Sequence, residues 1–276
     1  MKTLNTIEEV RAWRGAQAEV GFVPTMGALH EGHASLIRRS AADNPATLVS
    51  VFVNPTQFGP NEDLAKYPRT LDADLKLCEA AGATAVFTPD KSMMYPPGFR
   101  SWVIVDELGD RLCGSSRPGH FKGVTTVVAK LFNIAQATRA YFGQKDAQQA
   151  LILRRMVSDL NLPLELVVCP TVREADGLAL SSRNRYLNED ERKRAVGLHK
   201  ALAEVERLFK AGTTKTAILH PALVTILDDY VDKLDYAEIV DADSLQPLDE
   251  VDRPTLVAIA AFVGSTRLID NTIIGV

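Results

Sequence analysis

The sequence predicts an α/β protein, with a Rossmann-like, doubly wound parallel sheet followed by a second, smaller α+β domain. Two observations predict this fold class. Short strand-like runs alternate with helical stretches up to about Pro170, which is the pattern of βαβ units. Beyond that point follow a turn-rich segment, two longer helical stretches and several short β-like runs. We therefore expect a Rossmann-like domain over residues 1–170 and a smaller domain over residues 171–276.

Capping signals and apolar runs predict the elements of the first domain. Thr6 followed by Glu9 resembles a capping box ahead of a short helix, and an apolar strand at residues 20–23 is expected to stop at Pro24. Further strands are predicted at residues 47–53, 83–87, 140–142 and 164–168, and helices at residues 34–42, 71–81, 124–135 and 148–160. This alternation predicts a sheet that is covered by helices on both faces.

The second domain and two loops complete the predicted organisation. In the second domain we expect helices at residues 189–210 and 216–234 and strands at residues 236–240, 256–262 and 266–270. Two irregular stretches of the first domain, residues 54–68 and 110–122, are long enough to indicate binding loops.

The bulk composition favours a small-molecule partner. The 276 residues are 46% hydrophobic and 24% charged with a net charge of −4, so no global positive field attracts nucleic acid or an anionic membrane. Residues 1–14 form a charged amphipathic stretch rather than a signal peptide, and no run of about 18 apolar residues occurs. Cys78, Cys113 and Cys169 lack CxxC spacing and suit free thiols. We expect a cytoplasmic protein without membrane contact.

The strongest motif follows the first core strand and opens a helix, at the sheet edge where doubly wound folds bind ligands. His30 and His33 are three residues apart, which places both imidazoles on one side of the first helical turn, beside backbone N–H groups that favour phosphate. Gly27 and Gly32 let the backbone approach a ligand closely. Imidazole N–H groups can stabilise charge while an α-phosphorus is attacked. The segment comprises Met26, Gly27, Ala28, Leu29, His30, Glu31, Gly32 and His33.

Two plainer interpretations compete at this motif, a surface histidine pair and a metal site. A zinc site requires further ligands, yet His120, His199 and His220 are distant in sequence and have no neighbouring cysteine pair. We therefore assign no metal ligand. A strand, a Pro-Thr-Met-Gly turn and His-x-Gly-His at a helix start together resemble the nucleotide-binding signature of the adenylyl-transferring superfamily that includes class I aminoacyl-tRNA synthetases.

Two more segments are predicted to contact phosphate or ribose. The first consists of Gly143, Gln144, Lys145 and Asp146. It follows the end of another predicted strand, so the topology brings it to the same edge of the sheet. Lys145 can neutralise phosphate and Asp146 can accept hydrogen bonds from ribose hydroxyls. The second offers two hydroxyls and a guanidinium for anions and consists of Leu180, Ser181, Ser182, Arg183 and Asn184. Each segment taken alone could equally be an ordinary polar loop, but a serine nucleophile is disfavoured because no G-x-S-x-G elbow is present.

Neutral amide groups are the candidates for binding a hydroxy acid. Asn54 and Gln57 lie where a strand runs into a loop, flanked by aromatic residues. A site that hydrogen-bonds each substrate hydroxyl rejects analogues that lack it, so Gln57 and Gln149 are predicted specificity residues. The loop 117–121 carries cationic groups that could cover the site. The alternative for all of these side chains is an ordinary solvent-facing position.

Taken together and in order, these segments are similar to the pantothenate synthetase family. The resemblance rests on residues 24–33, 52–58, 67–70, 119–121, 143–146 and 180–184 and covers essentially the whole chain. It implies a homodimeric, Mg²⁺-dependent ligase that joins pantoate to β-alanine through an acyl adenylate, with AMP and diphosphate released. By position, residues 26–33 and 143–146 would bind ATP, completed by Val172 and residues 180–183. Gln57 would contact pantoate and β-alanine, and Gln149 pantoate.

The catalytic residues predicted from the motifs and the resemblance together are His30, His33 and Lys145, which we expect to stabilise the transferring phosphate. A nucleotidyltransferase that releases a dinucleotide-like product is the nearest enzymatic alternative, because the histidine motif serves both reactions. An ATP-responsive binding protein would bind the nucleotide without consuming it. An RNA-charging synthetase is disfavoured because the chain is short, acidic overall and has no evident basic appendage.

Overall fold

A computed structural model describes residues 1–59 and 64–275 and contains one large parallel sheet. Its strands lie in the order β1-β4-β3-β2-β5-β6, and every recorded pairing in it is parallel. The strands are β1 (Lys2–Leu4), β2 (Gly21–Thr25), β3 (Thr47–Val51), β4 (Ala85–Phe87), β5 (Arg139–Gly143) and β6 (Glu165–Cys169). Chain order reverses between β2 and β5, so the sheet is doubly wound, as predicted.

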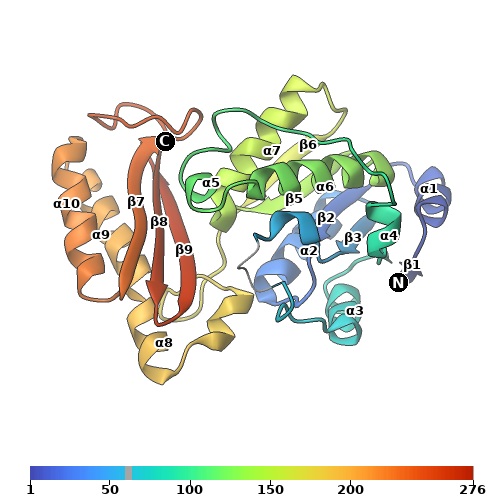
Figure 1. The fold of residues 1–276 in the computed structure, drawn as a ribbon, viewed down its shortest axis with the longest axis horizontal. Helices are drawn as coiled ribbons and strands as arrows, with labels where there is room; N and C mark the ends of the chain where they lie inside the picture. The colour runs from blue at the N-terminus through green and yellow to red at the C-terminus, as the bar shows by residue number, and fades with distance from the viewer. Residues whose placement is uncertain (60–63, 276) are drawn as a thin grey trace.

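Helices cover both faces of this sheet (Figure 1). One face is covered by α1 (Ile7–Gly15), α6 (His120–Ala135) and α7 (Ala147–Asp159), the other by α2 (Glu31–Asp43) and α3 (Leu71–Ala80). Side chains alternate between the faces along β2, because Phe22 packs with Phe132 in one core cluster while Val23 belongs to the other. Two further short helices are α4 (Lys91–Met94) and α5 (Cys113–Ser116).

The C-terminal part folds around a small antiparallel sheet. It contains α8 (Glu189–Ala195), α9 (Gly197–Lys210), α10 (Thr216–Asp228), β7 (Lys233–Asp241), β8 (Thr255–Val263) and β9 (Thr266–Ile274). The helices bury one face of this sheet in their own core cluster. The other face turns toward the large sheet (Figure 1), and its Val240, Leu256 and Ala258 join the core cluster of the N-terminal part. This second sheet confirms the predicted fold class, while the boundary at residue 170 stays a prediction.

Among the predicted element boundaries that differ from the structure, three have a clear physical cause. Strand β2 continues through Pro24 to Thr25, because β5 pairs with β2 only at Gly21 and Phe22, so the missing N–H removes no ladder bond there. The helix expected over residues 189–210 is two helices separated at Val196. The helix expected to reach residue 234 ends at Asp228, because the following residues enter β7 and pair with β8.

The predicted loops contain more regular structure than the sequence indicated. Residues 110–122 include α5 and the first turn of α6, which begins at His120. Within residues 54–68, Pro55–Gln57 form a 3₁₀ turn named η1, and residues 60–63 lie outside the described residues. Strand β1, which the sequence did not indicate, pairs with β4 at the edge of the sheet. Within residues 1–59 and 64–275, no helix is both long and apolar enough to cross a membrane.

Candidate active site

The candidate active site lies at the carboxyl ends of β2 and β5, where the chain order of the sheet reverses. The His-x-Gly-His segment connects β2 to α2, and residues 143–146 connect β5 to α7 through the 3₁₀ turn η2 (Gln144–Asp146). Parallel strands present their carboxyl ends at one edge, so neighbouring strands bring both segments together. The topology therefore produces the convergence that the sequence predicted.

Two hydrogen bonds fix the histidine pair at the start of α2. His30 is the N-cap, and its Nδ1 accepts from the Gly32 N–H at 3.2 Å. Nδ1 of His33 accepts from the His30 N–H at 3.3 Å, and the ring centroids lie 4.2 Å apart. This is the reciprocal pattern of a capping box made with imidazoles. Because each Nδ1 accepts, each neutral ring carries its proton on Nε2 and presents that N–H as a donor.

Both imidazoles are neutral at physiological pH. Burial, with a contribution from Lys145, lowers the pKa of His30 to about 4, although Asp146 opposes the shift. Burial and the neighbouring His30 lower the pKa of His33 to about 3. The same influences show that Lys145 and Asp146 lie close to the histidine pair. The site thus supplies neutral N–H donors beside one cationic side chain, which suits the charge on a phosphate.

These lowered pKa values predict a loss of stability in acid. An unfolded histidine takes up a proton below about pH 6.5, whereas folded His33 does so only near pH 3. Stability is therefore fully present above the unfolded pKa and falls as the pH is lowered toward the folded one. The comparison variant is His33→Gln, because glutamine keeps an acceptor for the cap. When the pH is lowered from 7.5 to 5.5, the unfolding free energy of the parent protein should fall by about 1.4 kcal/mol more than that of His33→Gln. Denaturant titrations at both pH values measure this difference, and equal losses would contradict it.

The third predicted segment reaches the same place from the C-terminal side. A side-chain carbon added at Gly32 would lie 3.8 Å from Cβ of Leu180, so residues 180–183 lie against the start of α2. Ser181 caps the 3₁₀ turn η3 (Ser182–Tyr186), and its Oγ accepts a hydrogen bond from the Arg183 N–H. The Leu180 N–H in turn donates to the carbonyl of Val172 at 3.0 Å. The fold thus brings all three predicted nucleotide-binding segments together.

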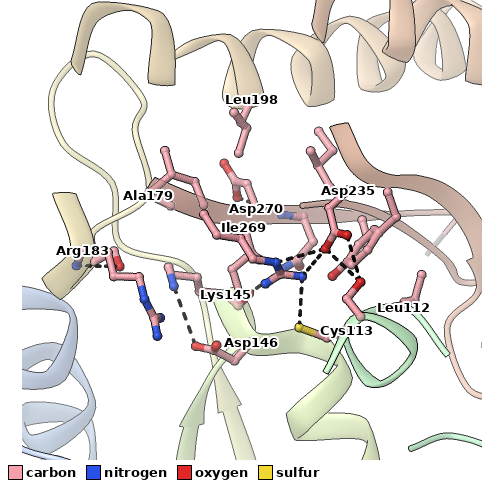
Figure 2. Close-up of a pocket in the computed structure, with 18 of the residues that line it drawn as sticks. Leu112, Cys113, Lys145, Asp146, Ala179, Arg183, Leu198, Asp235, Ile269 and Asp270 are labelled. Atoms are coloured by element: carbon pink, nitrogen blue, oxygen red, sulfur yellow. Dashed lines mark hydrogen bonds and ion pairs between the residues drawn. The ribbon is translucent and has the colours of Figure 1, made fainter. Parts of the chain in front are cut away.

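A cavity of about 790 Å³ adjoins these segments between the large sheet and the C-terminal sheet. Figure 2 shows Lys145, Asp146 and Arg183 on one side of it and β9 residues such as Asp270 on another. Gln149 and Ser181 also line it, whereas His30 and His33 lie outside its lining. Its volume is in the range of small-molecule sites. Lys145 is 20% exposed and lies 4.0 Å from the Asp146 carboxylate.

The predicted acid-binding amides lie next to the first segment. Gln57 Nε2 contacts the Met26 sulfur at 2.9 Å, which joins the two predicted sites. Asn54 is 1% exposed, and its amide donates to Gln57 Oε1 and to the Gly123 carbonyl. Its oxygen accepts from the Tyr95 hydroxyl at 2.8 Å. Asn54 is therefore placed to orient Gln57, and direct contact between Asn54 and a substrate stays a prediction.

Asp74 is a residue of this region that the sequence reasoning missed. Its carboxylate is 2% exposed and accepts from the backbone N–H groups of Ala28 and Leu29 at 3.0 and 2.8 Å. Gly27 and Ala28 both have positive φ values, 79° and 51°, and such a conformation is strained at alanine. The buried carboxylate thus stabilises the turn that precedes the histidine motif. Its position in α3, within the capping region of a helix, gave no sign of this role.

Removing one acceptor from Asp74 should weaken nucleotide binding. In Asp74→Asn an amide NH₂ group faces one of the two backbone N–H donors, so one hydrogen bond to a charged group is lost. We therefore expect the KM for ATP to rise about tenfold. The exposed Asp72→Asn change in the same helix is the matched control and should leave KM unchanged. Steady-state kinetics with varied ATP measures both. An unchanged KM in folded Asp74→Asn protein would remove this role.

The described residues contain no protein cage for a metal ion. Within residues 1–59 and 64–275, no group of three or more histidine, cysteine, aspartate or glutamate side chains could hold one. Mg²⁺ is commonly bound by one or two carboxylates together with substrate phosphates and water. Asp146, 4.0 Å from Lys145, supplies one carboxylate at this site, so a Mg²⁺ ion that arrives with the nucleotide would fit this donor set.

A doubly wound sheet with neutral histidines and a lysine at its switch point is the arrangement expected of a nucleotide-binding enzyme of the adenylyl-transferring class. Residues 2–273 match the family model described as pantoate-beta-alanine ligase. The chain is 53% identical to the pantothenate synthetase of Thermotoga neapolitana over the full length of both. The chain therefore belongs to the pantoate-β-alanine ligase family.

Two solved structures show the same architecture. The pantothenate synthetase of Thermus thermophilus has a TM-score of 0.94 at 45% identity, with 99% of each chain covered. The pantoate-beta-alanine ligase of Francisella tularensis, complexed with beta-gamma ATP and beta-alanine, has a TM-score of 0.81 at 34% identity, covering 99% of this chain and 97% of that one. Both similarities extend across the two sheets, so the family assignment applies to the whole fold.

Proposed function

We propose that this protein condenses (R)-pantoate with β-alanine at the expense of ATP, forming pantothenate, AMP and diphosphate. Membership of the pantoate-β-alanine ligase family supports the overall reaction. The observation that carries the proposal for the site is the convergence of neutral His30 and His33, Lys145 and Gln57 at the switch point. These groups provide phosphate donors next to an amide that suits a hydroxy acid.

The reaction requires two displacements. A pantoate carboxylate oxygen attacks the α-phosphorus of ATP, the bond to the β-phosphate oxygen breaks, and diphosphate leaves with pantoyl adenylate formed. The free amine of β-alanine then attacks the acyl carbon, AMP leaves, and the nitrogen loses one proton. A free carboxylate resists attack by an amine because it has only a poor leaving group. Adenylation overcomes this because AMP is a stable leaving group. The protein's task is positioning and charge stabilisation.

Each group has a role in this sequence. The Nε2–H groups of His30 and His33, with Lys145, stabilise the negative charge that shifts between phosphate oxygens as diphosphate leaves. Gln57 and Gln149 orient pantoate, and Gln57 also contacts β-alanine. The ATP site consists of residues 26–33 and 143–146, completed by Val172 and residues 180–183. Asp146 would help to hold a Mg²⁺ ion that arrives with the nucleotide, and such an ion would supply positive charge to the phosphates.

The wider organisation is part of the same proposal. Residues 1–170 form the ATP- and pantoate-binding domain, and residues 171–276 form a smaller domain that closes over the site. The protein acts in the cytoplasm as a homodimer. The buried, free thiols of Cys78, Cys113 and Cys169 suit a reducing compartment.

Product analysis tests the reaction directly. Purified protein is mixed with ATP, Mg²⁺, pantoate and β-alanine, and products are identified by mass spectrometry, with each substrate omitted in turn. Pantothenate and AMP in equal amounts, formed only in the complete mixture, are the expected result. A product that retains AMP would favour the nucleotidyltransferase. If the folded protein binds ATP but does not consume it, the result would favour the alternative of a non-catalytic ATP-responsive binding protein.

A further inference from the structure

Asn271, a buried residue within β9, contacts the segment that carries Lys145. Its amide Nδ2 donates to the backbone carbonyls of Gln144 and Lys145 at 3.0 and 2.8 Å. Its Oδ1 accepts from Gln144 Nε2 at 3.0 Å. The residue is 5% exposed, so water competes little for these bonds. One side chain of the C-terminal sheet thus satisfies two carbonyls of the segment between β5 and α7.

The preceding residue, Asp270, is linked through Arg173 to the third nucleotide-binding segment, residues 180–183. Its 2% exposed carboxylate receives two hydrogen bonds from Arg173, at 2.6 and 3.0 Å. Arg173 also donates to the Gly177 carbonyl and is bridged to Ala179 by backbone pairing, and residues 180–183 follow directly. The Asn271 N–H donates to Asp270 Oδ1 at 2.8 Å, which links the two side chains. Asp270 and Lys145 both line the cavity (Figure 2).

Adjacent residues of one strand therefore connect two segments that otherwise belong to different parts of the chain. Strand β9 pairs with β8 along its whole length, so the backbone of Asp270 and Asn271 is held in place by the antiparallel ladder. A donor held in this way restricts the carbonyls it binds, and through them the direction of the Lys145 side chain. Side chains that orient a reacting group are effective when their own positions are locked by packing.

We propose that Asn271 is a positioning residue, which orders the Lys145 segment for ATP and, together with Asp270, fixes it relative to residues 180–183. This inference rests on the proposed role of these segments in ATP binding. It assigns the C-terminal sheet a direct part in preparing the phosphate site. Pantoate binding, by contrast, is assigned to Gln57 in η1 and Gln149 in α7. Among the described residues, the side-chain hydrogen bonds of Asn271 go to Gln144 and Lys145 and not to these two side chains.

Two variants test the donor, with a third as matched control. Asn271→Ala removes the donor and the acceptor, while Asn271→Asp keeps the shape but presents an oxygen to two carbonyl oxygens. The control is Thr272→Ala, which removes the hydrogen bond from the next side chain of β9 to Glu206 of α9. Three quantities are measured for each protein: KM for ATP and for pantoate, binding of a non-hydrolysable ATP analogue, and hydrogen exchange of peptides covering residues 143–149 and 26–33.

Both Asn271 variants should raise KM for ATP and the dissociation constant of the analogue by about tenfold, as expected for the loss of buried hydrogen bonds. KM for pantoate should change less than KM for ATP. Exchange should accelerate in residues 143–149 and not in residues 26–33. Thr272→Ala should show neither effect, even where it lowers the melting temperature. Equal changes in the Asn271 variants and the control, or ATP binding within twofold of the parent, would overturn the inference. A parent protein that neither binds nor consumes ATP would instead overturn the proposed function.

Discussion

Replacing His33 by alanine should lower turnover by about 10²–10³, the cost of losing one preorganised transition-state donor. The imidazole is neutral because burial lowers its pKa to about 3, and its Nδ1 is occupied by the His30 N–H. Only its Nε2–H is left to make the proposed contact with phosphate, so alanine removes that donor and also one acceptor of the cap. Single-turnover measurement of AMP formation reports the effect on the chemical step.

The control for this prediction separates catalysis from folding. His220→Ala removes a histidine whose ring contacts the Ala237 carbonyl within the C-terminal part, and it should leave turnover unchanged. His33→Gln keeps an acceptor at the third helical position, so its melting temperature should exceed that of His33→Ala. A folded His33→Ala protein with turnover within threefold of the parent would remove the residue from the mechanism.

Gly32→Ala is expected to separate activity from stability, with turnover reduced about 10²-fold and the fold retained. The added carbon would lie 2.9 Å from Cε1 and 3.0 Å from Nδ1 of His30. The ring is the end of a side chain and can rotate away, so the clash displaces His30 rather than the backbone. Alanine is the better helix residue by about 0.5–1 kcal/mol. This gain offsets the loss of the cap hydrogen bond from the Gly32 N–H to His30, about 1 kcal/mol, so the melting temperature should change little.

The matched substitution is Gly15→Ala, because Gly15 ends α1 and a carbon added there meets no atom within 4 Å. It should change neither turnover nor the response to ATP. Thermal melts and steady-state kinetics of both variants give the comparison. If Gly32→Ala turns over like Gly15→Ala, the packing of His30 over Gly32 has no functional importance.

Local patterns determined much of this protein. The capping box at Thr6 and Glu9 is present as predicted, because it depends on residues three apart. The strands of the large sheet, apart from β1, and its main helices lie within a few residues of the predicted ranges, because hydrophobic periodicity reflects burial directly. The convergence of residues 26–33 with residues 143–146 followed from topology, since neighbouring parallel strands share one carboxyl edge.

Other boundaries depended on contacts that a local pattern does not contain. The helical pattern of residues 189–210 is continuous, yet α8 and α9 separate at Val196, where the ring of Tyr230 lies so close that only glycine fits at position 197. Residues 233 and 234 suit a helix, but pairing with β8 places them in β7. In both places tertiary packing overrides the intrinsic preference of the segment.

The sequence by itself determined the fold class, the order of the motifs and the residue types that could handle phosphate, because these are properties of short segments and their succession. Tertiary structure alone decided how those residues are held. Asp74 reaches Ala28 across 46 residues, and Asn271 reaches Gln144 across 127. The neutral state of His30 and His33 likewise depends on burial and on Lys145. Such effects arise from groups that only folding brings within a few ångströms, where desolvation and hydrogen bonding become strong.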